Sequence, residues 1–427
     1  MFSWYFRINL LVRIMSALVL GIIVGLYLAY NPGLAKPFIA YTKFFGDLFI
    51  NLLKMIIVPT IFLSLIGGAS SITPTQLGRV GVKTLLYYFV TSIIAIGIAL
   101  LLANLLQPGL GLNITGAASV AGRAAKTPGF GEVLMAIIPQ NPVASLAKGD
   151  VLPIIFFALS FGIALSFLRD HSDGTIKRQA DTLFDAISVA AEAMYVVVRG
   201  IMQYAPIGVF VLISIVFAQQ GAKVVGPLVF LTFVVYLGLV LHLVIGYGGA
   251  LLVFKMSFFK FLRGANEAML TAFCTRSSNA TLPISMRVAD EKLGVPRGIS
   301  SFALPIGATV NMDGTAIYLA VCTMFIGNAV GKPLTMDQQF MVMLTATLAA
   351  IGAAGVPGAG ALMMLMVLET VGLPVEAGSA VAACYAMILG MDALFDMGRT
   401  GMNVTGDIVG VCVVAKVEGE LDESKWA

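Results

Sequence analysis

The sequence contains eight apolar stretches, each long enough to cross a lipid bilayer as a helix. They lie near residues 9–30, 38–70, 81–110, 150–168, 187–218, 224–254, 300–328 and 380–415. A spanning helix needs about 20 apolar residues, and several of these stretches are long enough to tilt. Because 59% of the residues are hydrophobic and only 11% are charged, a soluble fold could not bury so much apolar surface. The chain is therefore predicted to be an all-α polytopic membrane protein.

The segments between these stretches carry clustered positive charge. The basic residues are Arg7, Arg13, Arg79, Lys83, Arg169, Lys177, Arg178, Lys255, Lys260, Arg263, Lys416 and Lys425. By the positive-inside rule these segments face the cytoplasm, so both termini are predicted on the cytoplasmic side of a cell inner (plasma) membrane. A net charge of only +4 gives no indication of a nucleic-acid partner.

Cysteine and histidine show no pattern typical of a disulfide or of a transition-metal site. The cysteines are Cys274, Cys322, Cys384 and Cys412, which have no paired spacing. His171 lies in a polar segment and is predicted to be solvated. His242 stands alone in an apolar stretch, and we interpret it as a satisfied core histidine and not as a proton relay.

Two further stretches are apolar but interrupted in the middle. Residues 258–292 contain the polar run Arg276 to Asn279 followed by Pro283, and residues 337–370 contain several glycines with Pro357. The arms on either side, of about 10 to 15 residues, are too short to cross the bilayer. Each stretch is therefore predicted to form a re-entrant helical hairpin that enters and leaves the membrane on one side.

Each predicted hairpin is followed by a span with polar residues at its centre. The span at 300–328 contains Asn311, Asp313 and Thr315, and the span at 380–415 contains an acidic series. Two such units entering from opposite sides form the inverted repeat common among secondary transporters. Gly307 and Gly314 would let the first of these spans loosen and offer carbonyl oxygens, which suit a hard cation.

The acidic series of the last span lies on one helical face. Asp392, Asp396, Arg399, Asn403 and Asp407 are spaced by 4, 3, 4 and 4 positions, which at about 100° per residue aligns their side chains. A charge at the bilayer centre costs roughly 2.5 to 3.5 kcal/mol even on mild insertion scales. The face is therefore predicted to have a function.

Acidic residues outnumber basic residues in this predicted site. The set consists of Asp313, Asp392, Asp396 and Asp407 against Arg276 and Arg399. Four acids and two bases leave two uncompensated negative charges, which would be too costly to bury unpaired. Cations from solution, Na⁺ or H⁺, are the natural compensation. An anionic substrate would add further negative charge and depend on those cations, so the charge balance predicts coupled transport.

Four motifs, in this order, resemble those of a known family. They are TRSSNATLP at 275–283, NMDGT at 311–315, AAGVPGAGA at 353–361 and DALFDMGRTGMNVTGD at 392–407. The sequences KMIIVPTIF at 54–62 and YYFVTS at 87–92 are also similar. Over nearly its whole length the chain resembles the glutamate transporter family of dicarboxylate or amino acid:cation symporters, especially the prokaryotic sodium-coupled aspartate and glutamate transporters. The resemblance implies a transporter of acidic amino acids and not an enzyme.

The resemblance implies a substrate site at the matching positions. Arg399 would bind the side-chain carboxylate of aspartate or glutamate through two hydrogen bonds, and Asp396 would bind the ammonium group. Asn403 and Ser278 would hold the α-carboxylate. The remaining substrate-binding positions are Arg276, Ser277, Thr315, Val356, Gly360 and Thr400.

The resemblance also implies three sodium sites, with H⁺ as the alternative coupling ion. The first consists of Gly307, Asn311, Asn403 and Asp407; the second, largely of backbone carbonyls, of Thr309, Ala350, Ile351 and Ala353; the third of Tyr88, Thr91, Ser92, Asn311 and Asp313. Alanine stands at 350 and 353, where hydroxyl residues are common in the family, but the carbonyl ligands do not depend on these side chains.

The architecture implied by the resemblance is a homotrimer of eight spans and two hairpins that moves its substrate by an elevator mechanism. The implied divisions are a scaffold and trimer contact at 1–77 and 128–220, a mobile transport domain at 78–127 and 221–417, and a cytoplasmic tail at 418–427. Gly355, Pro357 and Gly358 of the second hairpin would form the gate, because glycine lets a hinge open at low energetic cost.

Several residues have alternative interpretations. Asp392 could join helices through hydrogen bonds instead of contacting a ligand, and Arg276 could pair with a carboxylate of the last span. Ser277 and Thr281 could hydrate the loop or bond to backbone at a helix end.

Alternative functions fit these residues less well. A C4-dicarboxylate carrier has no ammonium group for Asp396, and a neutral amino acid carrier has no use for Arg399. An intramembrane enzyme would need a catalytic pair or a nucleophilic serine motif, which the sequence lacks. Anion conduction, known among relatives, would be a secondary activity. The residues do not decide between aspartate and glutamate. The presence of Asp313, Asp407, Asn311 and Asn403 favours Na⁺ as the coupling ion, with H⁺ as the alternative.

Overall fold

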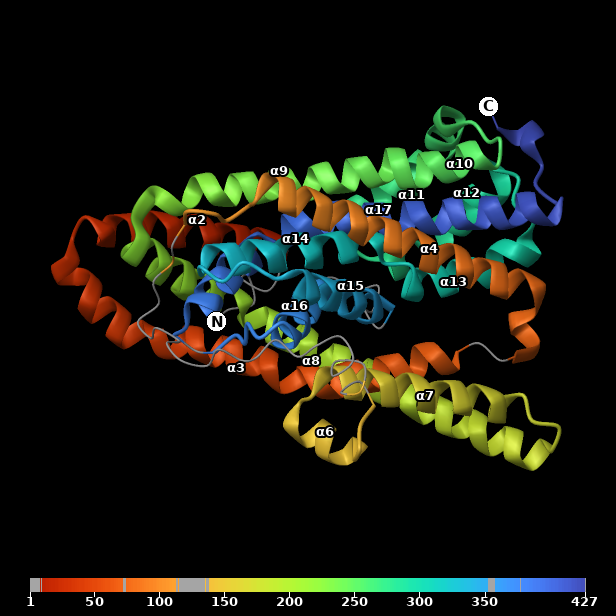
Figure 1. The fold of residues 1–427 in the computed structure, drawn as a ribbon, viewed down its shortest axis with the longest axis horizontal. Coiled ribbons are helices and arrows are strands. Elements are labelled where there is room, and N and C mark those ends of the chain that lie inside the picture. Colours follow the sequence, from red (N-terminus) through yellow and green to blue (C-terminus); the bar gives the residue numbers. More distant parts are fainter. Residues whose placement is uncertain are drawn as a thin grey trace.

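The computed structural model describes residues 10–71, 74–112, 138–351, 358–376 and 378–426, with the single residues Ile8, Ile114 and Met135. Within these ranges every regular element is a helix (Figure 1). Six helical stretches of the described part are long and apolar enough to cross a membrane, and two shorter apolar helices accompany them. The chain is therefore an α-helical integral membrane protein, as the hydropathy pattern predicts.

One of the six stretches is too long to be a single span. Gly174–Val253 comprises 80 residues, which at 1.5 Å per residue would extend for about 120 Å. It is divided near Gly221 by the short 3₁₀ turn η1 (Gly221–Val224). The prediction of eight spans is compatible with this division and stays a prediction.

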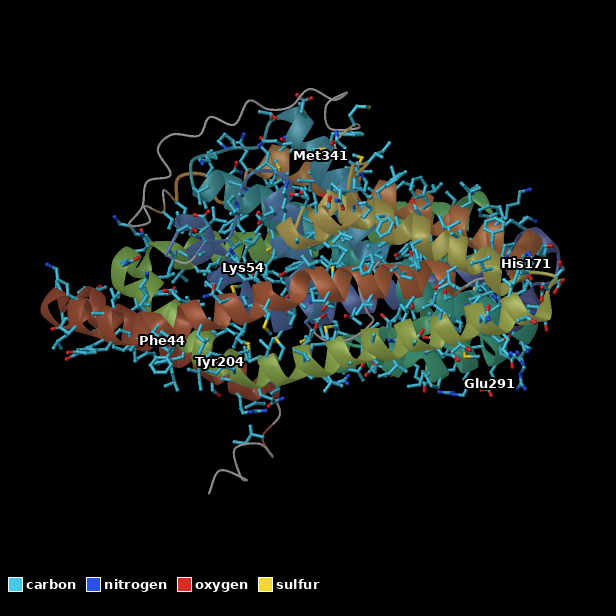
Figure 2. All side chains as sticks on the ribbon, turned by 90° about the horizontal axis from the view of Figure 1, so that it is seen from below. Phe44, Lys54, His171, Tyr204, Glu291 and Met341 are labelled. Atoms are coloured by element: carbon cyan, nitrogen blue, oxygen red, sulfur yellow. The ribbon has the colours of Figure 1, made fainter. Side chains whose placement is uncertain are left out.

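Four helices form one group on one side of the molecule. They are α2 (Leu10–Ala29), α3 (Pro32–Ser70), α7 (Val151–Arg169), which follows the short α6 (Pro142–Lys148), and α8 (Gly174–Gln220). Helices α2 and α3 lie along α8, and α7 packs against α3. The approach of α2 to α8 is close, because a Cβ atom at Gly25 would lie 2.5 Å from the Cβ atom of Phe217. Figure 2 shows Phe44 on the outer side of α3, where its side chain is 66% exposed. Such exposed apolar side chains suit contact with lipid or with another subunit.

The second group surrounds α17. Its elements are α4 (Pro74–Leu106), α9 (Val225–Leu241), η2 (His242–Tyr247), α10 (Gly248–Val253), α11 (Phe258–Thr275), α12 (Ser278–Glu291), α13 (Arg297–Val310), α14 (Asp313–Ala329), α15 (Met336–Ile351), α16 (Ala359–Thr370) and α17 (Ala380–Glu418). Helix α17 contacts α4, α9, α11, α12, α13 and α14. All residues of α14 are buried, so α14 and α17 form the centre of this group (Figure 1).

The predicted interruptions are confirmed where the structure describes them. Helix α11 ends at Thr275 and α12 begins at Ser278, and the span at 300–328 is divided between Val310 and Asp313. Pro283, predicted to belong to the interruption of the first hairpin, instead lies inside α12. The interruption of the second hairpin, at 352–357, lies outside the described residues.

Two helices begin earlier than their apolar stretches. Helix α3 begins at Pro32 and α8 at Gly174. Proline is well suited to the first helical position because it has no N–H group to satisfy there. The first turns of α8 are polar, with Lys177 and Arg178, so they form helix outside the apolar segment that hydropathy detects.

The predicted C-terminal tail is docked, and does not extend freely. The Trp426 side chain is 6% exposed, and its indole N–H donates to the carbonyl of Leu293 at 2.8 Å. Lys260 Nζ donates to the carbonyl of Trp426 at 3.1 Å, and the N–H of Asp422 donates to the carbonyl of Gly294 at 3.0 Å. The tail, which includes the 3₁₀ turn η3 (Glu423–Lys425), thus packs on the base of the first hairpin.

Several of the predicted cytoplasmic segments lie at one end of the molecule. His171, in the turn between α7 and α8, and Glu291, at the end of α12, lie at the same end (Figure 2), where the C-terminus also lies (Figure 1). Lys83 of α4 pairs with Glu418 at the end of α17 at 2.5 Å. These segments therefore share one end of the molecule, and the cytoplasmic orientation of that end stays a prediction.

Candidate functional site

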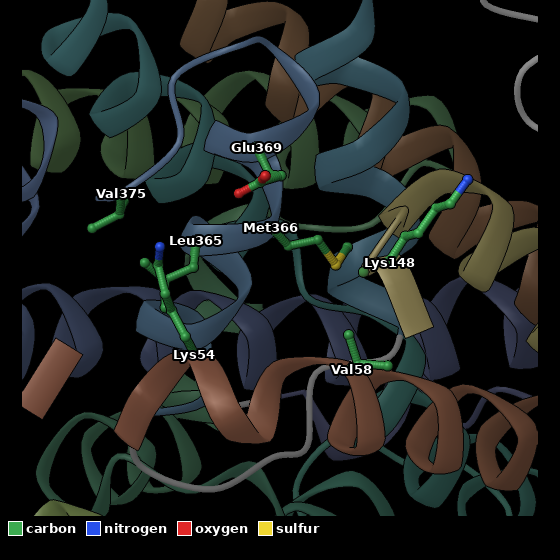
Figure 3. A pocket seen from close by; sticks show the side chains of 8 residues that line it. Lys54, Val58, Lys148, Leu365, Met366, Glu369 and Val375 are labelled. Atoms are coloured by element: carbon green, nitrogen blue, oxygen red, sulfur yellow. The ribbon is translucent and has the colours of Figure 1, made fainter. Parts of the chain in front are cut away.

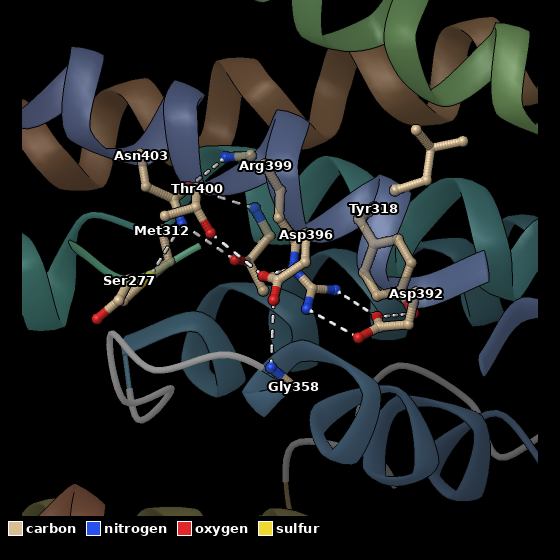
Figure 4. Close-up of polar contacts among 12 residues, drawn as sticks. Ser277, Met312, Tyr318, Gly358, Asp392, Asp396, Arg399, Thr400 and Asn403 are labelled. Carbon is tan, nitrogen blue, oxygen red and sulfur yellow. Dashed lines mark hydrogen bonds and ion pairs between the residues drawn. The ribbon is translucent and has the colours of Figure 1, made fainter. Parts of the chain in front are cut away.

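The predicted polar face of α17 is buried in the middle of the second helix group. The side chains of Asp392, Asp396, Arg399, Asn403 and Asp407 belong to residues that are each at most 5% exposed. They contact α14, the break between α13 and α14, and the N-terminal end of α16 (Figure 4). The spacing of these five residues therefore predicted a shared buried face correctly.

Arg399 is surrounded by acidic and aromatic groups. Its Nη1 and Nη2 donate to the two carboxylate oxygens of Asp392 at 3.0 and 3.5 Å, and its Nε donates to Asp396 Oδ1 at 3.0 Å. The guanidinium carbon lies 4.5 Å from the centre of the Tyr318 ring, and the Tyr318 hydroxyl donates to Asp392 Oδ1 at 3.1 Å. Asp392 thus makes a two-hydrogen-bond contact with Arg399, of the kind that the family resemblance assigns to the substrate carboxylate.

Asp396 joins α17 to α16. Its Oδ1 also accepts from the Thr400 hydroxyl at 3.2 Å, and its Oδ2 accepts from the N–H of Gly358 at 3.2 Å. Gly358 has a φ of 86°, a left-handed conformation that favours glycine. A Cβ atom at Gly360 would collide with the Arg399 guanidinium. The N-terminal end of α16 therefore lies directly against the charged pair.

Asn403 caps α14 from the neighbouring helix. Its Oδ1 accepts from the N–H groups of Gly314 at 2.8 Å and Thr315 at 3.4 Å. Its Nδ2 donates to the Thr315 hydroxyl at 3.2 Å and to Met312 Sδ at 3.0 Å. Because the first N–H groups of a helix have no partner within it, this side chain replaces the missing acceptor and holds α14 against α17.

The tip of the first hairpin lies near this cluster (Figure 4). Arg276 ends α11 with a φ of 56°, is half-buried, and has an Nε atom without a hydrogen-bond partner among the described residues. Its charge lies close enough to Asp396 to interact with it electrostatically. The Ser277 hydroxyl accepts from the N–H of Ala280 at 3.2 Å, which is the helix-end role foreseen as an alternative, and Ser278 is buried.

Asp313 has three hydrogen-bond partners from two other helices. The Ser92 hydroxyl of α4 donates to Oδ1 at 2.5 Å. The Tyr247 hydroxyl and His242 Nε2 approach Oδ2 at 2.9 and 3.1 Å. An ionised carboxylate only accepts hydrogen bonds, so with Asp313 ionised the arrangement requires the tautomer with its proton on Nε2. His242 Nδ1 is buried and has no partner within the described part of the chain.

Two other residues of the predicted third sodium site donate to backbone carbonyls, one within α4 and one on α13. The Thr91 hydroxyl donates to the carbonyl of Tyr88 at 3.1 Å, and the Tyr88 hydroxyl donates to the carbonyl of Ala303 at 3.2 Å. A Cβ atom at Gly307 would lie 2.6 Å from both the Tyr88 hydroxyl and Asp407 Oδ1. The predicted first and third sites therefore adjoin at Tyr88 and Gly307.

Asn311 connects the two sites and retains an unused oxygen. Its Nδ2 donates to Asp407 Oδ1 at 3.0 Å and to the carbonyl of Asn403 at 3.3 Å. Its Oδ1 is buried and accepts no hydrogen bond from the described residues. Carboxylate, amide and carbonyl oxygens are the donors that hard cations prefer. The chemistry of these residues therefore fits a sodium ion.

The predicted second sodium site is described only in part. Ala350 is buried near the end of α15, and the Thr309 hydroxyl donates to the carbonyl of Pro305 in its own helix at 3.4 Å. Ile351 is the last residue of α15. Ala353, Gly355, Val356 and Pro357 lie outside the described residues.

Comparisons with known proteins identify the family to which this site belongs. Residues 10–417 match the model of the sodium:dicarboxylate symporter family. The chain belongs to this family. Among its relatives is the proton/sodium-glutamate symport protein of Bacillus caldotenax, which is 34% identical over 98% of this chain and 97% of its own length.

Other relatives differ in the substrate that their names give. The proton/glutamate-aspartate symporter of Escherichia coli is 34% identical over 98% of this chain and 95% of its own length. The C4-dicarboxylate transport protein of Azorhizobium caulinodans is 33% identical over 98% of this chain and 91% of its own length. Membership in this family indicates a transporter and not an enzyme.

Four residues of the symporter site were missed by the sequence analysis. They are His242, Tyr247, Met312 and Tyr318. Tyr318 lies three positions beyond the motif at 311–315, and its contact with Arg399, 81 positions later, appears only in the structure. His242 and Tyr247 are five positions apart, a spacing that an α-helix does not place on one face.

Two cavities separate the helix groups of this symporter. One of about 210 Å³ lies between α3, α6 and α16 and is lined by Lys54, Lys148 and Glu369 among others (Figure 3). A second, of about 330 Å³, lies between α3, α8 and the start of α17, next to Lys43 and Ser379. Both cavities lie where the two helix groups meet.

Proposed function

We propose that this symporter carries L-aspartate or L-glutamate across the membrane together with Na⁺. The observation that carries the proposal is the buried Arg399, whose guanidinium lies between two carboxylates. A planar guanidinium is suited to two parallel hydrogen bonds with a carboxylate. The names of the Bacillus caldotenax and Escherichia coli relatives, which include glutamate, support an acidic amino acid.

In the proposed complex the substrate exchanges with Asp392. The substrate's side-chain carboxylate takes the two Arg399 nitrogens that Asp392 occupies, while Asp392 keeps the hydroxyl of Tyr318. Asp396 keeps its hydrogen bond to Nε and accepts from the substrate's ammonium group. The α-carboxylate is bound by Asn403 and the tip of the first hairpin.

A C4-dicarboxylate is the second candidate substrate, because the Azorhizobium caulinodans relative has that name. Aspartate brings one positive and two negative charges, so its ammonium offsets Asp396. A dicarboxylate brings two negative charges and no positive charge into a site with four buried aspartates. Its repulsion with Asp396 would have to be offset by additional cations, and the acidic amino acid is therefore favoured.

The proposed coupling ion binds where Asp407, Asn311 and Asp313 converge. A sodium ion needs several oxygen ligands, whereas a proton needs one acceptor. The unused Asn311 oxygen beside the Asp407 carboxylate supports sodium, and H⁺ is the alternative. Because the cation offsets acidic charge that the substrate increases, each should raise the affinity of the other.

The proposed mechanism is an elevator movement within a homotrimer. The group of α2, α3, α7 and α8 would be the scaffold, and the group around α17 the transport domain. The cavities between the groups support this division. The second hairpin, with Gly355, Pro357 and Gly358, would act as the gate, and both termini would face the cytoplasm.

Calorimetric binding to the purified protein tests the proposed function. We expect L-aspartate or L-glutamate to bind in sodium buffer and not when choline replaces sodium at the same pH, while succinate and L-serine bind weakly in both. If succinate binds more tightly than either amino acid, the substrate is a C4-dicarboxylate instead. If an acidic amino acid binds with an affinity that does not depend on sodium but changes with pH, the coupling ion is the proton and not sodium.

A further inference from the structure

A π-helical turn interrupts the helix that runs beside α4 and α14. It is η2, at His242–Tyr247, between α9 and α10. Turns of this type are rare and wider than α-helical turns, with hydrogen bonds between residues five apart. In an α-helix, at about 100° per residue, the first and sixth residues would point about 140° apart. In this wider turn both His242 and Tyr247 reach the same oxygen of Asp313.

Two glycines make room for the side chains of His242 and Tyr247 beside Asp313. The rings of His242 and Tyr247 lie edge to face with centroids 4.5 Å apart. A Cβ atom at Gly246 would lie 2.5 Å from the His242 ring, so a side chain there would displace the imidazole. A Cβ atom at Gly406 of α17 would collide with the Tyr247 hydroxyl. Both glycines therefore leave the space that the two rings occupy.

The turn determines which lone pairs of Asp313 are free. A carboxylate offers about four acceptor positions, two on each oxygen. Both positions on Oδ2 are used by His242 and Tyr247, and one position on Oδ1 is used by Ser92. Counting the partners in the described part of the chain, one position remains, on Oδ1. Asp313 is fully buried, so this fixed carboxylate can turn only that lone pair toward an ion.

The geometry points to His242 and Tyr247 as positioning residues for the coupling ion, held together by the π-helical turn. Neither residue belongs to the sodium sites that the family resemblance implies. They act through Asp313: two donors on Oδ2 hold the carboxylate so that Oδ1 faces the ion. This inference rests on the proposed sodium coupling and names the parts of the chain that determine the affinity for sodium.

The test measures sodium and substrate affinities separately in full-length variants. His242→Leu removes the donor, and His242→Gln retains a side-chain N–H. Val244→Ala is the matched control, because Val244 lies in the same turn with its side chain 52% exposed. Deletion of Ile245, which is 56% exposed, removes one residue of the turn and would restore α-helical spacing. The measured quantities are the sodium concentration that half-saturates aspartate binding, and the aspartate affinity at saturating sodium.

We expect His242→Leu to raise the half-saturating sodium concentration about 10- to 100-fold, the usual effect of losing a partner that orients a metal ligand. The aspartate affinity at saturating sodium should stay within about twofold of the wild type. His242→Gln should restore most of the sodium affinity, and Val244→Ala should behave as the wild type. The Ile245 deletion, if it yields folded protein, should resemble His242→Leu.

Two results would overturn the inference while the proposed function stands. One is a half-saturating sodium concentration in His242→Leu that equals that of the wild type. The other is an equal loss of sodium and aspartate affinity in both His242 variants, which would indicate only a packing role. A wild-type protein that binds aspartate equally well without sodium would instead overturn the proposed sodium coupling, and this inference with it.

Discussion

At the scale of residues, the site pairs its buried charges before a substrate is bound. Arg399 is held by Asp392 and Asp396, which avoids the large cost of an unpaired guanidinium in a buried site. The same pairing means that a substrate must replace one carboxylate by another. Binding is then an exchange of similar hydrogen bonds on Arg399, after which Asp392 keeps its hydrogen bond from the Tyr318 hydroxyl.

Arg399→Lys tests this role directly. Lysine keeps the charge but loses the planar pair of donors, and one charge-assisted hydrogen bond contributes about 1.5 to 3 kcal/mol. We therefore expect the dissociation constant of aspartate at saturating sodium to rise about 10- to 150-fold, measured by calorimetry. Thr405→Val is the control, because the Thr405 hydroxyl bonds back to Gly401 of the same helix. Unchanged affinity in Arg399→Lys would show that this arginine has only a structural role.

The residues that could be predicted are those that follow a regular period. Asp392, Asp396 and Arg399 were found because an α-helix of constant pitch aligns them. His242 was seen as an isolated core histidine, since nothing in an α-helical pattern relates it to Tyr247 or to Asp313. A change of helical pitch over six residues is not visible in hydropathy, and it decides which side chains reach the carboxylate.

At the scale of elements, helix ends supply much of the site. Asn403 caps α14, Ser277 caps α12, and the N-terminal end of α16 donates to Asp396. The sequence predicted these interruptions because glycine, serine and asparagine within an apolar stretch weaken a helix. It did not predict the docked C-terminal tail, whose contacts are with residues more than 100 positions away in sequence.

Trp426→Ala tests the docking of the tail. Loss of the buried indole and of its hydrogen bond to Leu293 should loosen the base of the first hairpin; truncating a buried tryptophan costs about 3 to 5 kcal/mol. We expect faster amide hydrogen exchange in α11 and α12, with α15 unchanged. Glu420→Ala, an exposed change in the same tail, should leave exchange as in the wild type. Equal rates in α11 and α12 for both variants would mean that the tail does not hold the hairpin.

At the scale of the whole molecule, two helix groups meet across cavities, and the four buried aspartates and Arg399 lie within one of them. Hydropathy could predict the helices but not this grouping, because the apolar residues that contact lipid and those that contact another helix look alike in sequence. The charge balance was predictable, since it depends only on which ionisable residues lie within apolar stretches. Four buried aspartates against Arg399 and the half-buried Arg276 still call for cations when all are ionised.

Uptake of radiolabelled L-aspartate into proteoliposomes tests this balance most directly. The vesicles are given an inward sodium gradient, an inward proton gradient without sodium, or neither. We predict accumulation above the external concentration with the sodium gradient alone, and none when choline replaces sodium on both sides. Accumulation driven by the proton gradient without sodium, or uptake that only equilibrates under every gradient, would contradict the account.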